Sequence, residues 1–222
     1  MAEVAFLAVD LGASSGRHVV GLYDGEHLWL EEVYRFDNGP VEMAGSLFWD
    51  LPRLWTELRQ GLRAAAVRFG GQIQSIGVAT WGVDFALLGR GDVLLGNPHH
   101  YRDSRTNGVM ETAFAQVSRQ EIFRHTGLQF MQFNTLYQLL AMLWQRSPLL
   151  EVAERLLMMP DLFHWLLTGE KSNEFTDVTT TQCYNPLQGD WAWELLDRFG
   201  LPRQIFGPIV PPGTVLGRLR PQ

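Results

Sequence analysis

The sequence has a single cysteine, no long apolar run and no excess of basic residues, and each shortage excludes a class of protein. Cys183 has no second cysteine to pair with, so a fold held together by internal disulfides is excluded and a reducing compartment is expected. No stretch approaches the roughly 18 consecutive apolar residues that a membrane-spanning helix needs. Lys and Arg number 18 against 24 Asp and Glu, a net charge of −6, whereas proteins that bind the nucleic-acid backbone show a basic face. We therefore expect a cytoplasmic protein with no nucleic-acid or membrane partner.

The remaining composition is that of a folded globular chain. Of the 222 residues 46% are apolar and 12% aromatic, which is enough apolar surface to offset chain entropy and excludes a disordered protein. The first ten residues carry no basic region, and their apolar run is too short for the core of a signal peptide.

The hydrophobic pattern predicts strands first and helices later. Val4–Val9 and His18–Tyr23 are short apolar runs around a Gly/Ser turn, and His27–Phe36 follows as a third antiparallel strand. Asp50 is a plausible N-cap for a helix that ends near Arg68. Together these elements predict an α/β fold that opens in a three-strand meander.

Further along the chain the pattern alternates before it becomes mostly helical. Ile73–Ala79 is expected as a strand and Phe85–Leu88 as its return strand. Helical spacing is then predicted around four segments, and the proline-rich tail is expected to be a loop with a short strand near 214–217. The four segments are Val109–Val117, Leu136–Gln145, Leu149–Leu157 and Asp161–Leu167.

The turn between the first two strands reads DLGASSGR at 10–17 and has the chemistry of a phosphate cradle. Its two glycines allow a tight hairpin whose backbone N–H groups converge on an anion, while serine hydroxyls and a guanidinium add donors. The carboxylate at the strand end would hold a divalent cation such as Mg²⁺. A polar hairpin turn without any ligand remains the alternative. The expected phosphate ligands are Ala13, Ser14, Ser15, Gly16 and Arg17, with Asp10 for the metal.

A second candidate, TWGVD at 80–84, ends a buried strand with an aromatic, a glycine and a carboxylate. Aromatic faces and carboxylates are what bind carbohydrates, and Gly82 would let the backbone approach a ligand. Trp81 is equally well explained as a core aromatic. A further polar group, Asp103 with Arg105, is alternatively a loop ion pair or a helix cap. No metal site is expected at 99–100, because the adjacent histidines point to opposite sides of an extended chain.

Taken together, these stretches resemble the FGGY family of carbohydrate kinases. The matching runs occur in the family's order and span nearly the whole chain: VDLGASSGR at 9–17, SIG at 75–77, TWGVDF at 80–85, YRDSRTNG at 101–108, FNTLYQL at 133–139, MPD at 159–161, LTG at 167–169 and TTTQ at 179–182. The cradle and the loop at 80–84 are the most specific of them.

The resemblance implies an actin/hexokinase-like, ribonuclease H-like lobe, with ATP and Mg²⁺ as cofactors. Residues 13–17 would then cradle the ATP phosphates and Asp10 would position the metal. Trp81, Gly82 and Asp84 would face the sugar, and Asp103 and Arg105 would lie where the family has an Asp/Arg pair beside it.

The resemblance also implies a missing half. Family members carry a catalytic aspartate in a His-Asp-Thr stretch of a second lobe, and no such stretch occurs in this sequence. Residues 1–222 are therefore expected to be an N-terminal lobe without a catalytic base, inactive without its C-terminal lobe.

Within the family the likeness favours L-rhamnulose as the acceptor. Two alternatives remain open. One is a kinase for another ketose such as L-fuculose or D-xylulose, because sugar choice depends on a few loop contacts. The other is a non-catalytic actin-like module that binds nucleotide or sugar without transferring phosphate.

Overall fold

The computed structural model describes residues 4–221, and the chain forms two compact units. The first unit comprises Met1–Val41 and Asp50–Trp81, and the second comprises Glu42–Trp49 and Gly82–Gln222. Residues 1–3 and 222 of the lobe expected over 1–222 lie outside the described residues.

The first unit is built on a four-stranded mixed sheet with the strand order β3-β2-β1-β6. Strands β1 (Val4–Leu11), β2 (Ser15–Tyr23) and β3 (Leu28–Asp37) form the expected antiparallel meander, and β6 (Ile73–Thr80) lies parallel to β1. A parallel pair needs a crossover connection, which the intervening helix supplies.

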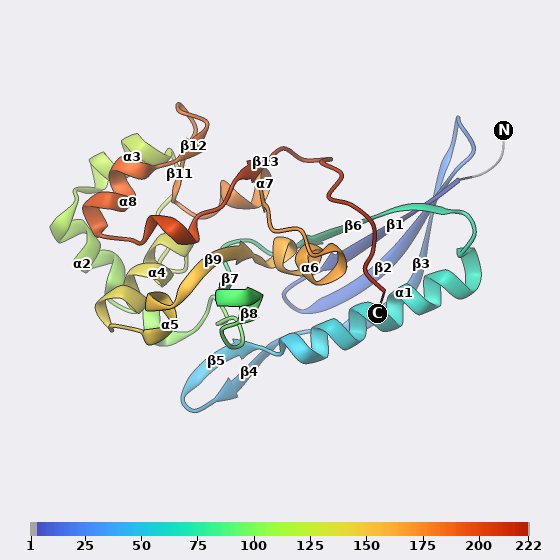
Figure 1. The fold of residues 1–222 in the computed structure, drawn as a ribbon, viewed down its shortest axis with the longest axis horizontal. Coiled ribbons are helices and arrows are strands. Elements are labelled where there is room, and N and C mark those ends of the chain that lie inside the picture. Colours follow the sequence, from blue (N-terminus) through green and yellow to red (C-terminus); the bar gives the residue numbers. More distant parts are fainter. Residues whose placement is uncertain (1–3, 222) are drawn as a thin grey trace. The chain divides into compact units, whose positions relative to one another are not determined.

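That helix, α1 (Leu51–Phe69), covers one face of the sheet (Figure 1). It begins as predicted, because the Asp50 side chain accepts a hydrogen bond from the Arg53 amide at 3.0 Å. Its inner face carries Leu54, Leu58 and Ala65, and the strands turn their alternate apolar side chains toward it. The opposite face of the sheet is exposed, with Phe6 of β1 among its large apolar side chains.

The second unit holds a smaller sheet surrounded by helices. Strand β7 (Phe85–Gly89) lies between β8 (Val93–Leu94) and β9 (Ala153–Met158), antiparallel to both. The principal helices of this unit are α2 (Val109–Gln116), α3 (Arg119–Thr126), α4 (Thr135–Trp144), α6 (Met159–Thr168) and α8 (Trp193–Phe199). The main core includes Phe85 and Leu87 of β7 together with buried side chains of β9 and α4.

Short elements complete the chain. Two-residue and four-residue strands pair locally, β4 with β5, β10 with β13 and β11 with β12. These elements are β4 (Pro40–Met43), β5 (Ser46–Trp49), α5 (Pro148–Glu151), β10 (Asn173–Glu174), α7 (Phe175–Val178), β11 (Tyr184–Asn185), β12 (Asp190–Trp191) and β13 (Ile209–Val210), with 3₁₀ turns at Arg90–Asp92, Ser104–Thr106 and Arg203–Ile205.

Three sequence predictions were wrong. Leu149–Leu157 is not one helix, because α5 ends at Glu151 and the rest enters β9. Phe85–Leu88 does form a strand, but it pairs with β8 and β9 rather than returning along β6. The strand in the tail lies at Ile209–Val210 instead of 214–217. A short apolar run fits a buried strand and a buried helix equally well, and the pairing partner decides between them.

Among the helices of residues 4–221, none combines the length and the apolar character needed to cross a membrane.

Candidate functional site

The candidate phosphate cradle is the turn that joins β1 to β2. It is pinned by three backbone and side-chain bonds: the Gly12 amide donates to the Ser15 carbonyl at 2.8 Å, the Asn38 amide donates to the Ser14 carbonyl at 2.9 Å, and the Asn38 side-chain amide donates to the Gly12 carbonyl at 2.8 Å. The Gly12 and Ser14 carbonyls therefore point at Asn38. The amides of Ala13 and Ser14 have no acceptor anywhere in residues 4–221, which leaves two donors for an anion.

The glycines of this turn are required for space. A Cβ at Gly16 would come within 2.2 Å of the Phe36 ring, and one at Gly12 would come within 3.0 Å of the Ser15 carbonyl. Neither glycine has a positive φ. The turn can therefore lie flat against β3 only because both positions lack a side chain.

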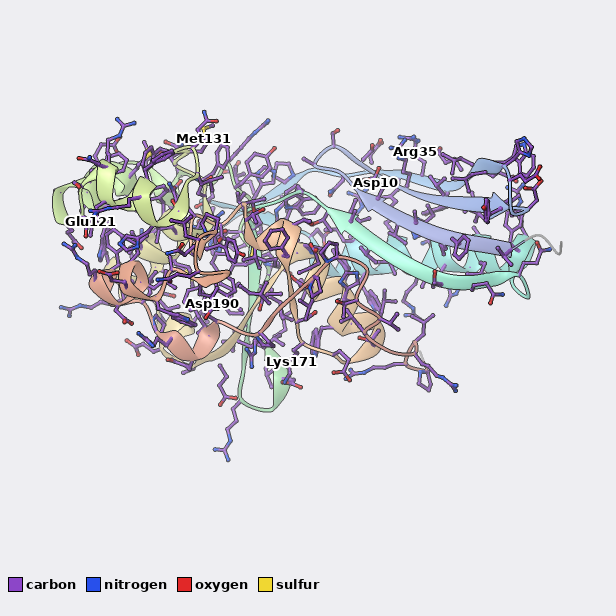
Figure 2. All side chains as sticks on the ribbon, turned by 90° about the horizontal axis from the view of Figure 1, so that it is seen from above. Asp10, Arg35, Glu121, Met131, Lys171 and Asp190 are labelled. Atoms are coloured by element: carbon purple, nitrogen blue, oxygen red, sulfur yellow. The ribbon has the colours of Figure 1, made fainter. Side chains whose placement is uncertain are left out.

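Charged side chains gather beside the turn. The Arg17 Nε atom donates to Asp10 Oδ2 at 2.8 Å, and both side chains are about half exposed. Arg35 lies opposite Arg17 on β3 and reaches the Ser15 hydroxyl at 3.5 Å. Figure 2 labels Arg35 and Asp10, which both lie on the first sheet. Two guanidiniums facing each other across a strand pair repel unless anions separate them. Asp10 and Glu32 supply that negative charge here, and a phosphate would add more.

The donors fit a nucleotide phosphate, and the single carboxylate fits a hydrated cation. Within the described residues no three His, Cys, Asp or Glu side chains gather as a metal site. Asp10 would thus be one protein ligand of a Mg²⁺ ion whose other ligands are waters and phosphate oxygens, which is the coordination this ion prefers.

The register of the first sheet brings the cradle and the start of the second candidate loop, Thr80 and Trp81, to the same edge. Strands β1 and β6 run parallel, with Asp10 opposite Ala79 and Leu11 opposite Thr80. The cradle and the half-buried Trp81 therefore follow the carboxyl ends of neighbouring strands. Ligands bind beyond the carboxyl ends of strands in open α/β sheets.

In the second unit Asp84 is the centre of a buried polar network. It is fully buried at 0% exposure. One carboxylate oxygen accepts from Trp49 Nε1 at 2.7 Å and from the Tyr101 amide at 3.1 Å, and the other accepts from Gln138 Nε2 at 2.8 Å. Burial raises the pKa of Asp84 to about 6, and these hydrogen bonds oppose the rise.

Asp103 and Arg105 belong to the same network. Asp103 caps its 3₁₀ turn by accepting from the Arg105 amide at 3.0 Å, and it also accepts from the Leu47 amide at 2.6 Å. The Arg105 guanidinium donates to Gln138 Oε1 at 2.6 Å and lies 3.9 Å from Asp103 Oδ1. Burial lowers the pKa of Arg105 to about 10, so the group stays charged at neutral pH. The cap and the ion pair that the sequence left as alternatives are both present.

Gln138 joins this network although the sequence patterns did not single it out. It is the lone amide side chain in the otherwise apolar run of α4, and it is 1% exposed. An isolated polar residue at a buried helix position is the signal that could have found it, because a buried amide needs partners.

The chain matches the model of the FGGY family of carbohydrate kinases, N-terminal domain, over residues 5–222. It is 44% identical over 216 residues to the rhamnulokinase of Oceanobacillus iheyensis and 42% identical over 214 residues to that of Bacteroides thetaiotaomicron. These alignments cover 97% and 96% of this chain but 46% and 44% of the two relatives. The chain thus spans a little under half the length of the curated relatives it matches.

Solved structures show the same fold. The gluconate kinase from Lactobacillus acidophilus superposes with a TM-score of 0.87 at 18% identity, over 99% of this chain and 44% of that one. A ligand-bound xylulose kinase from the same organism gives a TM-score of 0.86 at 20% identity, over 97% of this chain and 44% of that one. The expected actin/hexokinase-like fold is confirmed. With its sequence matched from residue 5 to residue 222, the chain belongs to the FGGY family of carbohydrate kinases.

Proposed function

We propose that these 222 residues are the N-terminal domain of an ATP-dependent kinase that phosphorylates L-rhamnulose on its 1-hydroxyl. The observation that most directly supports nucleotide binding is the turn at 12–15, whose Ala13 and Ser14 amides have no acceptor in the described chain. The sugar is proposed from relatives named rhamnulokinase at 41–44% identity.

The cradle residues would bind and orient the phosphate chain of ATP. The Ala13 and Ser14 amides and the Ser14 and Ser15 hydroxyls donate to phosphate oxygens, and Arg17 presents its planar guanidinium to them. Gly16 keeps the turn flat on the Phe36 ring. Asp10 would hold Mg²⁺, which when bound neutralises charge on the phosphate oxygens.

On the sugar side we propose that Trp81 and Gly82 contact the acceptor. Both are partly exposed, whereas Asp84 is fully buried and already accepts three hydrogen bonds. Asp84, Asp103 and Arg105 would act on the sugar by fixing the loops that hold it.

The general base and the remainder of the cleft would come from a C-terminal lobe. Loss of a general base alone typically lowers the rate by about 10² to 10⁴. We therefore expect these 222 residues on their own to give no steady ADP production with L-rhamnulose. Sustained, sugar-dependent turnover by the isolated chain would contradict this.

We also propose a cytoplasmic location, because ATP is the phosphoryl donor and Cys183 is a buried free thiol.

The test is a substrate panel with the full-length protein. L-Rhamnulose, L-fuculose and D-xylulose are compared by kcat/KM, and we expect L-rhamnulose to be highest. A higher value for another ketose would overturn the substrate, and nucleotide binding without transfer would favour a non-catalytic module.

Arg17→Ala should raise the KM for ATP by roughly ten- to hundredfold, since hydrogen bonds to charged groups are strong. The KM for the sugar should not change, and Arg63→Ala on the exposed side of α1 is the control.

A further inference from the structure

The segment Gly82–Asp84 is a strained three-residue turn. The Asp84 amide donates to the Gly82 carbonyl at 2.9 Å, and Val83 between them has a φ of 67°. This is the γ-turn with positive φ, which is rare. For a β-branched residue the left-handed region is an outlier, because the branched side chain crowds the backbone. Such a conformation persists only where the surroundings over-determine it.

Side chains from two distant segments hold this turn. The Thr180 hydroxyl accepts from the Val83 amide at 3.0 Å. The Val83 carbonyl accepts from the Thr135 hydroxyl at 2.7 Å and from Gln138 Nε2 at 3.2 Å. Both polar groups of the strained residue are thus fixed by side chains rather than by regular secondary structure. We call Thr135, Gln138 and Thr180 the turn clamp.

Thr180 is also fitted to the bare backbone of Gly82. A Cβ at Gly82 would come within 2.9 Å of the Thr180 Oγ1 and Cγ2 atoms. The same hydroxyl donates to the Asp177 carbonyl at 2.8 Å, and this second hydrogen bond fixes the orientation of the hydroxyl. Thr180 can therefore occupy this position only because residue 82 has no side chain.

Gln138 connects the turn to the charged network. Its amide nitrogen also bonds Asp84, and its oxygen accepts from Arg105. Gln138 and Thr135 are each 1% exposed, so neither is available to touch a ligand. Their effect on a ligand would have to pass through the turn.

We propose that the turn clamp positions the Gly82 backbone for the acceptor sugar, so that Thr180, Thr135 and Gln138 are positioning residues of the sugar site. This rests on the proposed function. Without the clamp, Val83 relaxes out of the left-handed region and Gly82 moves with it. A displacement of about 1 Å in a binding segment can lower the rate by roughly a hundredfold.

The experiment uses the full-length enzyme and whichever ketose it phosphorylates best. Thr180→Val keeps the shape of the side chain and removes the hydrogen bonds that its hydroxyl makes with Val83 and Asp177, whereas Thr180→Ser keeps them. We expect Thr180→Val to raise the KM for the sugar by roughly ten- to hundredfold, with the KM for ATP within about twofold of the parent. Thr180→Ser should stay close to the parent. Thr179→Val is the matched control, because within residues 4–221 its hydroxyl bonds only the Thr176 carbonyl.

A second background separates positioning from general destabilisation. Glycine adopts a positive φ without strain, so Val83→Gly should make the clamp dispensable. We expect Thr180→Val to raise the KM for the sugar far less in the Val83→Gly background than in the parent. Melting temperature is recorded for every variant.

The outcomes are distinct. If Thr180→Val lowers the melting temperature while both KM values stay unchanged, the clamp is only structural and the proposal is overturned. If the effect persists undiminished with Val83→Gly, the strained turn is not the route and the proposal also fails. If the parent enzyme phosphorylates no ketose, the proposed function itself is overturned. If it phosphorylates a ketose other than L-rhamnulose, the same variants test the turn clamp with that ketose.

Discussion

At the scale of single residues, two buried carboxyl groups of the second unit have strongly raised pKa values. Asp161 is fully buried, and burial raises its pKa to about 7. Asp177 is 8% exposed, and burial, followed by the negative charge of Asp161, raises its pKa to about 8. Asp177 Oδ1 accepts from the Thr180 hydroxyl at 3.3 Å, whereas Asp177 Oδ2 is among the buried polar atoms that have no hydrogen-bond partner in the described part of the chain.

These pKa values predict the pH dependence of stability. A carboxyl group whose pKa is raised by folding binds its proton more tightly in the native state. The stability that the protonated Asp177 contributes to the folded state is therefore fully present below pH 3.8, and it is lost as the pH rises through the folded pKa of about 8. We expect the free energy of unfolding to fall between pH 4 and 8, and Asp177→Asn to reduce that fall. Urea denaturation at both pH values measures it, with the exposed Glu154→Gln as control. An equal fall in the free energy of unfolding between pH 4 and 8 for the parent and Asp177→Asn would contradict the prediction.

The sequence was informative about the cradle residues and uninformative about the network. Residues 10–17 are contiguous, so their chemistry can be read from one segment. The surroundings of Asp84 come from Trp49 and Gln138, which are 35 and 54 positions away along the chain. No local pattern predicts that these side chains will bury the carboxylate and complete its hydrogen bonds, since that depends on tertiary packing.

At the scale of elements, the packing of α1 on the first sheet depends on a close approach. Gly61 of the helix faces His18 of β2, and a Cβ at Gly61 would come within 2.2 Å of the imidazole ring. His18 is fully buried, and its Nε2 atom lies 3.0 Å from the Leu58 carbonyl. Burial lowers the pKa of His18 to about 4, so the ring is neutral at pH 7.

Gly61→Ala should therefore destabilise the protein. Glycine to alanine inside a helix ordinarily stabilises by about 1 kcal/mol. Here overpacking against His18, typically about 1–3 kcal/mol, should outweigh that gain. Thermal and urea unfolding measure the change. Val67→Ala in the same helix, where the side chain is 87% exposed, should be neutral or slightly stabilising. A more stable Gly61→Ala protein would show that the helix can move away from β2 at little cost.

Elements with a complete local signature were predicted well, and those defined by their partners were not. The meander and α1 have clear periodicity, turn residues and a cap, so their bounds were close to those observed. Strand β9 has a fully buried apolar end at Leu156–Met158, which fits either element type until β7 pairs with it. The β4–β5 hairpin was missed because its four-residue strands are too short for a periodic signal.

At the scale of the whole molecule, the first sheet leaves its second face uncovered. Phe6 is 42% exposed, Leu28 60% and Leu30 71%, and they line one hollow over strands β1, β2, β3 and β6. The sheet order also leaves β3 and β6 as its edge strands. Exposed apolar faces and open strand edges both favour association.

We therefore expect the isolated 222-residue chain to self-associate as its concentration rises. Leu30→Lys should reduce the association by placing a charge on the uncovered face. Val215→Lys, at a position 90% exposed in the second unit, is the matched control. Light scattering or sedimentation velocity gives the mass, and a monomer at high concentration would contradict the prediction.

The pairing of β1 with β6 also bears on how the proposed kinase could change its specificity. Leu11 opposite Thr80 means that backbone hydrogen bonds, rather than side chains, set the spacing between the strand end that leads into the proposed phosphate cradle and the strand end that leads into the proposed sugar loop. Residues beyond Thr80 can then be exchanged during evolution without disturbing that spacing. The same fold could then change its sugar specificity through substitutions in the loop that follows Thr80, while the proposed binding of the phosphoryl donor stays the same.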